Sequence, residues 1–183
     1  MTLSAPDATI RPSRSADMAA VTAIYRHHVL HGTASFETEP PDEAEMVRRR
    51  GDVVGRGLPH LLLEVAGQIR GYAYAGPYRP RAAYRDTVEN SVYLAPDAIG
   101  RGFGRQLLAA LIDECTAQGL RQMVAVVGDS ANLPSIRLHE RMGFRRVGTF
   151  VSVGFKHGRW LDTVLLQRTL GAGDTVPPQP REP

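Results

Sequence analysis

The most constraining feature of this chain is an apolar strand pattern that leads into a glycine-rich turn and then into a helix. Residues 91–94 have strand character, and Gly100, Gly102 and Gly104 precede the apolar positions of the helix. Glycine has no Cβ, so backbone amides in such a turn can approach a ligand closely. The first N–H groups of a helix are unpaired and lie at the positive end of its dipole. The segment therefore predicts an anion site, with the carboxylate of Glu89 beside it.

The length and composition predict one soluble globular domain. The chain has 183 residues, of which 43% are hydrophobic and 22% charged. We expect a flexible N-terminus over residues 1–8 and a domain over residues 9–170. Residues 171–183 contain glycine and proline with almost no core-forming side chains, which predicts a disordered tail.

The charge and the cysteine content limit the partners and the compartment. A formal net charge of +3 falls short of the dense basic face of a nucleic-acid binder. The only cysteine, Cys115, excludes an internal disulfide and is expected to be a buried hydrophobe. No apolar run approaches the roughly 20 residues of a membrane span, and no secretory signal is evident. We therefore expect a cytoplasmic protein that binds neither nucleic acid nor membrane. No metal is expected either, because convincing ligand spacing is lacking around His27, His28, His31 and His60.

The order of the expected elements indicates an α+β (mixed α/β) domain with one largely antiparallel central sheet flanked by helices. Ser15 is expected to cap the first helix, and Pro41 with the acids after it to begin the second. A hairpin is expected around residues 66–68. The other expected elements are strands at 10–12, 61–65, 69–75, 91–95, 123–127, 148–155 and 161–169, and helices at 101–117 and 132–142.

The glycine-rich turn resembles a known cofactor motif. Residues 99–104 resemble the acetyl-coenzyme A motif of the GNAT N-acetyltransferases, usually written Gln/Arg-x-x-Gly-x-Gly/Ala, with Ile99 at the first position. Residues 132–144 resemble the second half of that cofactor site. A nucleoside triphosphate loop would end in Gly-Lys-Ser/Thr, and a dinucleotide site would carry Gly-x-Gly-x-x-Gly after an N-terminal strand. Neither pattern is present.

Four further segments resemble one branch of this family. Residues 33–41, 71–77, 89–93 and 154–160 are similar to the phosphinothricin and methionine sulfoximine N-acetyltransferases, and the resemblance covers residues 9–170. It implies the GNAT acyl-CoA N-acyltransferase fold, acetyl-CoA as co-substrate, and a homodimer. It also implies acetylation of the α-amine of a small amino-acid-like substrate by direct transfer in a ternary complex.

The resemblance implies a set of cofactor-binding residues. The pyrophosphate would lie on the amides of the glycine turn, and the pantetheine arm would pair with the preceding strand, where an N–H near Leu94 would polarise the thioester carbonyl. Ile99 lacks the polar side chain usual at its position, but backbone amides do not depend on it. The implied cofactor-binding residues are Val92, Tyr93, Leu94, Gly100, Arg101, Gly102, Phe103, Gly104, Arg105, Asn132 and Ser135.

Two residues match the catalytic positions of the branch. Glu89 matches its general base, which would take a proton from the substrate ammonium. The alternative for Glu89 is a strand-end carboxylate paired with Arg85 or Arg101. His139 stands where many GNAT enzymes have a tyrosine that protonates the departing thiolate, and an imidazole can donate that proton at neutral pH. A structural histidine is the alternative.

Two arginines are candidates for substrate binding. Arg79 and Arg81 lie just before the strand of Glu89, and their planar guanidinium groups suit carboxylate and phosphinate. Phosphinothricin, methionine sulfoximine or sulfone, or a similar amino acid would fit this arrangement. The sequence leaves open two other functions: a protein or peptide amine acetyltransferase, and a non-catalytic acetyl-CoA sensor.

Overall fold

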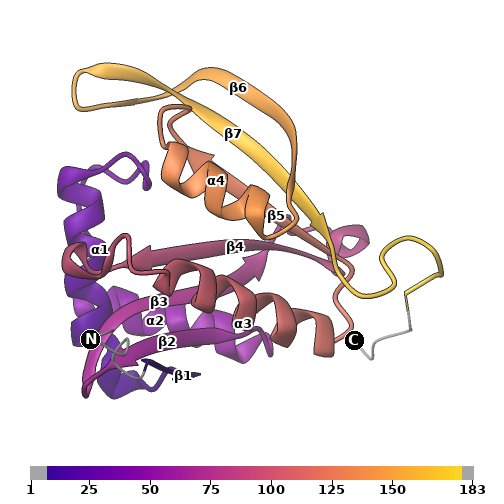
Figure 1. The fold of residues 1–183 in the computed structure, drawn as a ribbon, viewed down its shortest axis with the longest axis horizontal. Coiled ribbons are helices and arrows are strands. Elements are labelled where there is room, and N and C mark those ends of the chain that lie inside the picture. Colours follow the sequence, from indigo (N-terminus) through magenta and orange to yellow (C-terminus); the bar gives the residue numbers. More distant parts are fainter. Residues whose placement is uncertain (1–7, 179–183) are drawn as a thin grey trace, which may run out of the picture.

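The computed structural model describes residues 8–178, which form one seven-stranded sheet flanked by helices (Figure 1). The strand order is β1-β2-β3-β4-β5-β7-β6, and every neighbouring pair is antiparallel except β4 and β5. This confirms the predicted fold class. The strands are β1 (Ala8–Pro12), β2 (His60–Val65), β3 (Gln68–Pro77), β4 (Thr87–Leu94), β5 (Gln122–Gly128), β6 (Arg145–Lys156) and β7 (Arg159–Thr169). The α-helices are α1 (Met18–His31), α2 (Glu43–Gly55), α3 (Phe103–Ala117) and α4 (Leu133–Arg141).

Local chemistry accounts for several element boundaries. Asp42 caps α2, because its side chain accepts a hydrogen bond of 2.8 Å from the backbone N–H of Glu45. The β2–β3 hairpin turns at Ala66 and Gly67, both at positive φ, as a two-residue hairpin requires. The prediction that Ser15 caps α1 is wrong. Ser15 instead begins a short 3-10 turn that ends at Asp17, and α1 starts after it.

The two faces of the sheet are covered by different helices. Along β3, successive side chains point to opposite faces. A Cβ at Gly71 would collide with Leu94 and with Leu107 of α3, so the odd-numbered face lies against α3. The even-numbered face carries Tyr72 and Tyr74, which border a cavity with residues of α2. The core is continuous across both layers.

The sheet opens between β4 and β5. The two strands pair in parallel only from residues 87–90 of β4 to residues 122–125 of β5. Beyond that point, the rest of β4 pairs only with β3, and the rest of β5 pairs only with β7. Figure 1 shows α4, β6 and β7 on one side of this opening and α3 with β2 and β3 on the other. The opening places the ends of β4 and β5 beside α4.

The segment after β7 turns back toward the sheet. Residues 171–178 form successive turns, and the Arg121 side chain donates a hydrogen bond to the carbonyl of Pro177. The expected flexible N-terminus and disordered tail lie in part outside the described residues, namely at 1–7 and 179–183. Within residues 8–178, no helix combines the length and apolar character needed to cross a bilayer.

Candidate active site

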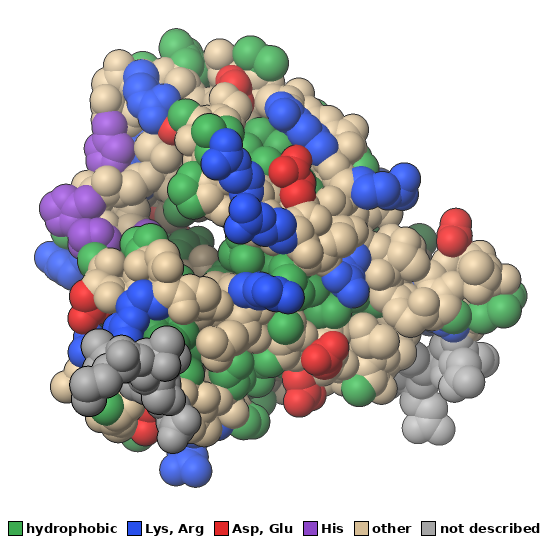
Figure 2. Space-filling view, viewed as in Figure 1, with side chains coloured by type: hydrophobic (Ala, Val, Ile, Leu, Met, Phe, Trp, Pro, Cys, Tyr) green, Lys and Arg blue, Asp and Glu red, His purple; other side chains and the backbone are tan. Residues whose placement is uncertain are grey.

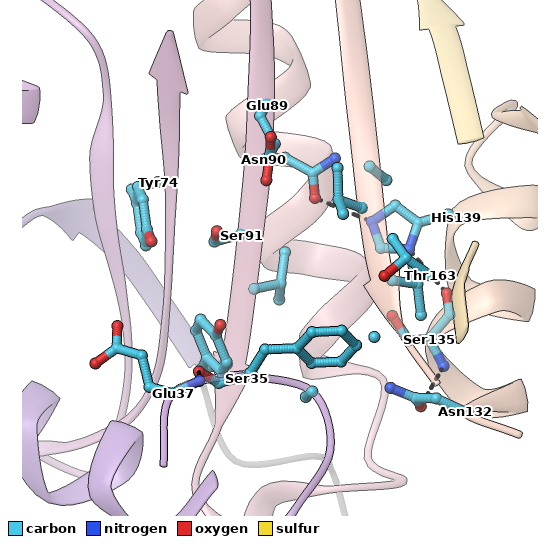
Figure 3. A pocket seen from close by; sticks show the side chains of 18 residues that line it. Ser35, Glu37, Tyr74, Glu89, Asn90, Ser91, Asn132, Ser135, His139 and Thr163 are labelled. Atoms are coloured by element: carbon cyan, nitrogen blue, oxygen red, sulfur yellow. Dashed lines mark hydrogen bonds between the residues drawn. The ribbon is translucent and has the colours of Figure 1, made fainter. Parts of the chain in front are cut away.

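A cavity of about 470 Å³ occupies the opening between β4 and β5. Its walls come from the loop over residues 34–37, from β3, β4 and β5, and from α4 and β7 (Figure 3). Among the residues expected to act in catalysis or cofactor binding, the ones that line it are Glu89, Val92, Tyr93, Asn132, Ser135 and His139. The tertiary structure thus brings these residues from two distant segments, β4 and α4, to one cavity.

The two catalytic candidates approach this cavity from opposite faces of β4. Glu89 and Asn90 are neighbours on the strand, so their side chains point to opposite faces. Asn90 contacts His139, whereas Glu89 pairs across the sheet with Gly76 on the face of Tyr74. Figure 3 shows Tyr74 on the β3 side of β4 and His139 on the β5 side. A group in the opening would therefore meet Glu89 on one side and His139 on the other.

Glu89 lies in an environment that favours its protonated form more than water does. Burial raises its pKa above the ordinary value, and the nearby positive charge of Arg79 works against that rise. The predicted alternative, a pair with Arg85 or Arg101, is not formed among the described residues. Arg85 pairs with Asp86 at 3.7 Å, and the Arg101 guanidinium lies 5.0 Å from the ring centre of Phe103.

His139 is buried, with 4% of its surface exposed, and both of its ring nitrogens face oxygen atoms. Nδ1 lies 2.8 Å from the carbonyl oxygen of Ser135, and Nε2 lies 2.9 Å from Oδ1 of Asn90. The Asn90 amide nitrogen donates to the carbonyl of Val124 at 3.1 Å, which directs Oδ1 toward the imidazole. Both ring nitrogens thus face acceptors, and a neutral imidazole can donate to only one of them. Burial lowers the pKa of His139 despite the hydrogen bond to Ser135.

Asn90 was missed by the sequence analysis. It follows Glu89 directly and is buried, with 6% of its surface exposed. A polar residue at an alternate position of an apolar strand was the available signal. Its partner comes from a helix 49 residues further along the chain, so only the fold could identify it.

The glycine-rich turn has the backbone conformation expected of an anion site. Gly100 and Gly102 have φ values of 79° and 81°, which other residues rarely adopt, and Gly102 caps α3. Gly104 has a different role, because a Cβ there would lie 3.3 Å from Leu138 of α4. The glycines therefore both shape the turn and let α3 approach α4. Ile99, which replaces the usual polar residue, is 56% exposed.

The end of β4 is held by α1. Val92 and Tyr93 line the cavity, whereas Leu94 does not. The carbonyl oxygen of Leu94 lies 2.7 Å from Nε2 of His28, and the His28 ring packs against Tyr93 with 5.4 Å between ring centres. These contacts fix the strand on which the expected thioester contact depends.

The polar start of α4 faces the cavity. The Asn132 side chain accepts a hydrogen bond of 3.4 Å from the backbone N–H of Ser135 and thereby caps the helix. Just before it, Asp129 is buried at a φ of 71° and accepts hydrogen bonds from the backbone N–H of Ala131 and the hydroxyl of Thr33. Asp129 thus connects the start of α4 to the loop that closes the cavity.

The two candidate substrate arginines are exposed and do not line the cavity. The Arg79 guanidinium lies 5.1 Å from the ring centre of Tyr78 and acts electrostatically on Glu89. Arg81 precedes a short 3-10 turn, Ala82–Tyr84. Arg79 thus acts on Glu89 through its charge, whereas Arg81 has no contact with the cavity residues among those described.

The loop over residues 34–37 supplies contacts that sequence reasoning did not assign. The buried Lys156 donates a hydrogen bond of 2.7 Å to the carbonyl of Ser35, and burial lowers the Lys156 pKa. Glu37 accepts from the Tyr25 hydroxyl at 2.9 Å and pairs with Arg49 at 2.6 Å. The likeness of residues 33–41 to the family was the only signal for this loop.

Phe36 occupies a slot made by two glycines. A Cβ at Gly128 or at Gly154 would lie within 3 Å of the Phe36 ring, so the missing side chains leave room for it. The ring therefore holds the loop against β5 and β6 at the rim of the cavity.

The surface beside the opening suits an anionic organic ligand. Figure 2 shows a hollow at the opening, edged by basic side chains over the region where α3 and α4 lie in Figure 1. Near it, α3 carries Arg105 in its first turn, and α4 carries Arg137 and Arg141. Among residues 8–178, no group of three or more His, Cys, Asp or Glu side chains is arranged to hold a metal ion.

Comparisons with known proteins agree with this geometry. Residues 21–144 match the acetyltransferase (GNAT) family. The chain is 56% identical over 171 residues to a phosphinothricin N-acetyltransferase of Alcaligenes faecalis, covering 93% of this chain and 87% of that protein. It is 41% identical over 171 residues to an L-methionine sulfoximine/L-methionine sulfone acetyltransferase of Pseudomonas aeruginosa, covering 93% and 99% of the two chains.

Among solved structures, a GNAT phosphinothricin acetyltransferase from Sinorhizobium meliloti in complex with acetyl-CoA is similar throughout. Its TM-score is 0.92 at 47% identity, and the match covers 94% of this chain and 93% of that one. The fold, the cavity between β4 and β5 and these likenesses lead to one conclusion. The chain belongs to the acetyltransferase (GNAT) family and is an N-acetyltransferase of the phosphinothricin and methionine sulfoximine acetyltransferase branch.

Proposed function

We propose that this protein transfers the acetyl group of acetyl-CoA to the α-amine of a small amino acid of the phosphinothricin or methionine sulfoximine type. The observation that carries the proposal is the position of Glu89. It is a carboxylate whose pKa burial raises, and it lines the cavity where β4 and β5 separate. The related proteins act on amino acids of this type, and the similar structure from S. meliloti contains acetyl-CoA.

Acetyl-CoA would enter from the hollow beside α3. Its pyrophosphate would lie on the amides of residues 100–105, at the positive end of the α3 dipole. Its extended arm would run along Val92, Tyr93 and Leu94, which have no β5 partner at that level. Asn132 and Ser135 line the cavity opposite that strand and offer polar contacts to the arm.

The acetyl transfer would be direct, within a ternary complex. Glu89 takes a proton from the substrate ammonium, and the freed amine attacks the thioester carbonyl to form a C–N bond. The backbone N–H of Leu94 stabilises the oxyanion. The nitrogen then loses its second proton to solvent, collapse breaks the C–S bond, and the thiolate takes a proton.

His139 would supply that proton from Nε2, the nitrogen that faces Asn90. Because Asn90 holds this nitrogen at 2.9 Å, donation breaks one hydrogen bond. Asn90 would therefore orient the imidazolium form until the thiolate forms. The lowered pKa makes that cation a stronger acid and also reduces its fraction at neutral pH.

Arg79 would bind the carboxylate of the acceptor, because its charge already acts on Glu89. Arg81, which the structure leaves on the exposed loop, would contribute longer-range attraction for an anionic acceptor.

The test is a CoA-release assay with acetyl-CoA and a panel of acceptors. Phosphinothricin, methionine sulfoximine and methionine sulfone should be acetylated, with little turnover of peptides. Activity on peptides alone would support the protein acetyltransferase alternative. Binding of acetyl-CoA by isothermal titration without turnover of any amine would support a sensor.

We also propose that the protein is a homodimer, formed through β6. This strand is at the edge of the sheet and presents unpaired backbone groups. The exposed apolar side chains gathered on it and on the adjoining end of β7 are Val147, Phe150, Val151, Val153, Phe155 and Trp160. A second copy would cover this surface. Sedimentation equilibrium should give a dimer, and Val151→Asp should shift it to the monomer.

A reducing, cytoplasmic compartment fits the single thiol. Cys115 is buried in α3, and burial raises its pKa to about 12, so the thiol is neither paired nor reactive. Fractionation of the native host should recover the protein with cytoplasmic markers.

A further inference from the structure

The chain contains a single lysine, and that lysine is buried near the active-site cavity. Of its 22 lysine and arginine residues, only Lys156 is a lysine. Lys156 is the last residue of β6 and is 5% exposed. A lysine ammonium is a compact charge with three donors, whereas an arginine guanidinium is a wide planar fork. The one basic position that has the compact cation is therefore a position inside the protein.

The Lys156 ammonium is directed at one backbone carbonyl. Nζ donates a hydrogen bond of 2.7 Å to the carbonyl oxygen of Ser35, and none of the ion pairs among residues 8–178 includes Lys156. The negative charge of Glu37 acts on Lys156, but Glu37 pairs with Arg49 at 2.6 Å. Burying an ammonium without a carboxylate partner is costly. A lysine at such a position is a candidate for a role other than stability.

Ser35 is held from both sides of the opening between β4 and β5. Its hydroxyl lies 2.8 Å from the hydroxyl of Tyr25 in α1, a helix that packs on β3 and β4. Its carbonyl is held by Lys156 from β6, which lies on the other side of the opening. These two contacts connect the two sides of the opening through one residue of the loop.

The same loop forms one wall of the cavity, because Ser35, Phe36 and Glu37 all line it (Figure 3). The Phe36 ring packs against Gly154, which faces the same side of β6 as Lys156, since the two are two residues apart in a regular stretch of the strand. β6 thus contacts the loop twice. The Phe36 ring fills space, whereas the Lys156 ammonium fixes the direction of a peptide unit.

We propose that Lys156 is a positioning residue, whose ammonium fixes the Ser35 carbonyl and thereby holds the loop over residues 34–37 across the opening before any ligand binds. Its effect on catalysis rests on the proposed function, because the loop and Glu89 line the same cavity. A side chain without the ammonium leaves the carbonyl without its donor and releases the loop. The glycine turn before α3 does not contain this contact, so acetyl-CoA should bind as before.

The first test measures the loop in the free protein. Lys156→Met removes the charge and the donors, and methionine adapts well to a buried position. Amide hydrogen exchange over residues 33–37 should become about tenfold faster, the change expected from one lost hydrogen bond to a charged group. Arg145→Met removes an exposed cation at the other end of β6 and should leave this exchange unaltered. Unaltered loop exchange in folded Lys156→Met protein would overturn the proposal.

The second test separates the two substrates. In Lys156→Met the KM for methionine sulfone should rise about tenfold, while kcat and the affinity for acetyl-CoA stay within about twofold, because only the loop has moved. Equal losses of affinity for both substrates would contradict a role confined to the loop. Wild-type protein that acetylates no amino acid would instead contradict the proposed function, and the exchange measurement would still decide the role of Lys156.

The third test restores the ammonium and does not depend on the folding of Lys156→Met. In a Cys115→Ala background, Lys156→Cys has one thiol, which 2-bromoethylamine converts in the unfolded chain to a side chain of lysine length that ends in an ammonium. After refolding, the alkylated protein should regain the slow loop exchange and the low KM, and the unalkylated protein should not. Refolded, alkylated protein that behaves like the unalkylated form would show that the ammonium does not position the loop.

Discussion

Nε2 of His139 lies 2.9 Å from Oδ1 of Asn90, at the level where β4 and β5 separate. The Asn90 amide cannot turn around without losing its hydrogen bond to Val124 and placing two oxygens together. Asn90 therefore presents only an acceptor to Nε2, as the Ser135 carbonyl does to Nδ1. The hydrogen bonds favour a proton on both nitrogens, whereas burial opposes the charge, and burial prevails in lowering the pKa.

Asn90→Asp should raise the pKa of His139, because a carboxylate beside the imidazole favours the charged form. Histidine NMR signals followed from pH 4 to 9 would show the shift. If His139 protonates the thiolate, the alkaline limb of the kcat profile should move to higher pH as well. If the His139 pKa rises but the alkaline limb of the kcat profile stays at the same pH, His139 is a structural residue and not the acid.

Glu89→Gln should lower kcat by about 10²–10⁴-fold, the usual contribution of a positioned general base. Because the wild-type pKa is raised, the acid limb of the wild-type profile should lie above the ordinary glutamate value of 4.5. Affinity for acetyl-CoA should not change. Glu114→Gln, on the exposed side of α3, is the matched control. Unaltered turnover in Glu89→Gln would remove this residue from the mechanism.

The buried His60 should make the protein less stable in acid. Its folded-state pKa of about 4 lies below the unfolded value of 6.5, so only the unfolded chain gains the proton between these values. The free energy of unfolding should thus fall from pH 6.5 to 4, with at most about 3 kcal/mol from His60. Urea titrations should show that the free energy of unfolding falls less over this pH range in His60→Phe than in the wild type. The exposed His31→Phe should behave as wild type, and equal pH dependence in both variants would contradict the assignment.

Gly154→Ala should push Phe36 out of its slot, because the new Cβ would lie within 3 Å of the ring. Overpacking of this kind costs about 1–3 kcal/mol. We expect a lower melting temperature and a higher KM for the acceptor, since the loop over residues 34–37 lines the cavity. Gly148→Ala, also in β6 but with no atom near its Cβ, should do neither. In a Phe36→Ala background, Gly154→Ala and Gly148→Ala should have the same effect on melting temperature and KM. That result would confirm that the Phe36 ring causes the difference between them.

The sequence predicted the elements well where local chemistry decides them. Asp42 and the positive-φ pair at Ala66 and Gly67 act within a few residues, so helix starts and turns could be read directly. The prediction that Ser15 caps α1 failed because a 3-10 turn and Asp17 lie within the same few residues and compete to define the start of the helix. The catalytic roles of Glu89 and His139 stay predictions, although both residues line the cavity.

The sequence by itself determined the fold class, the glycine turn before α3 and the family, because these depend on residue type and spacing along the chain. The tertiary structure alone decided that Asn90 holds His139, that Phe36 fits between Gly128 and Gly154, and that Gly76 leaves space beside Glu89. These contacts join side chains from distant segments through the register of β3, β4 and β5. That register follows from packing the whole sheet, so no local pattern could reveal it.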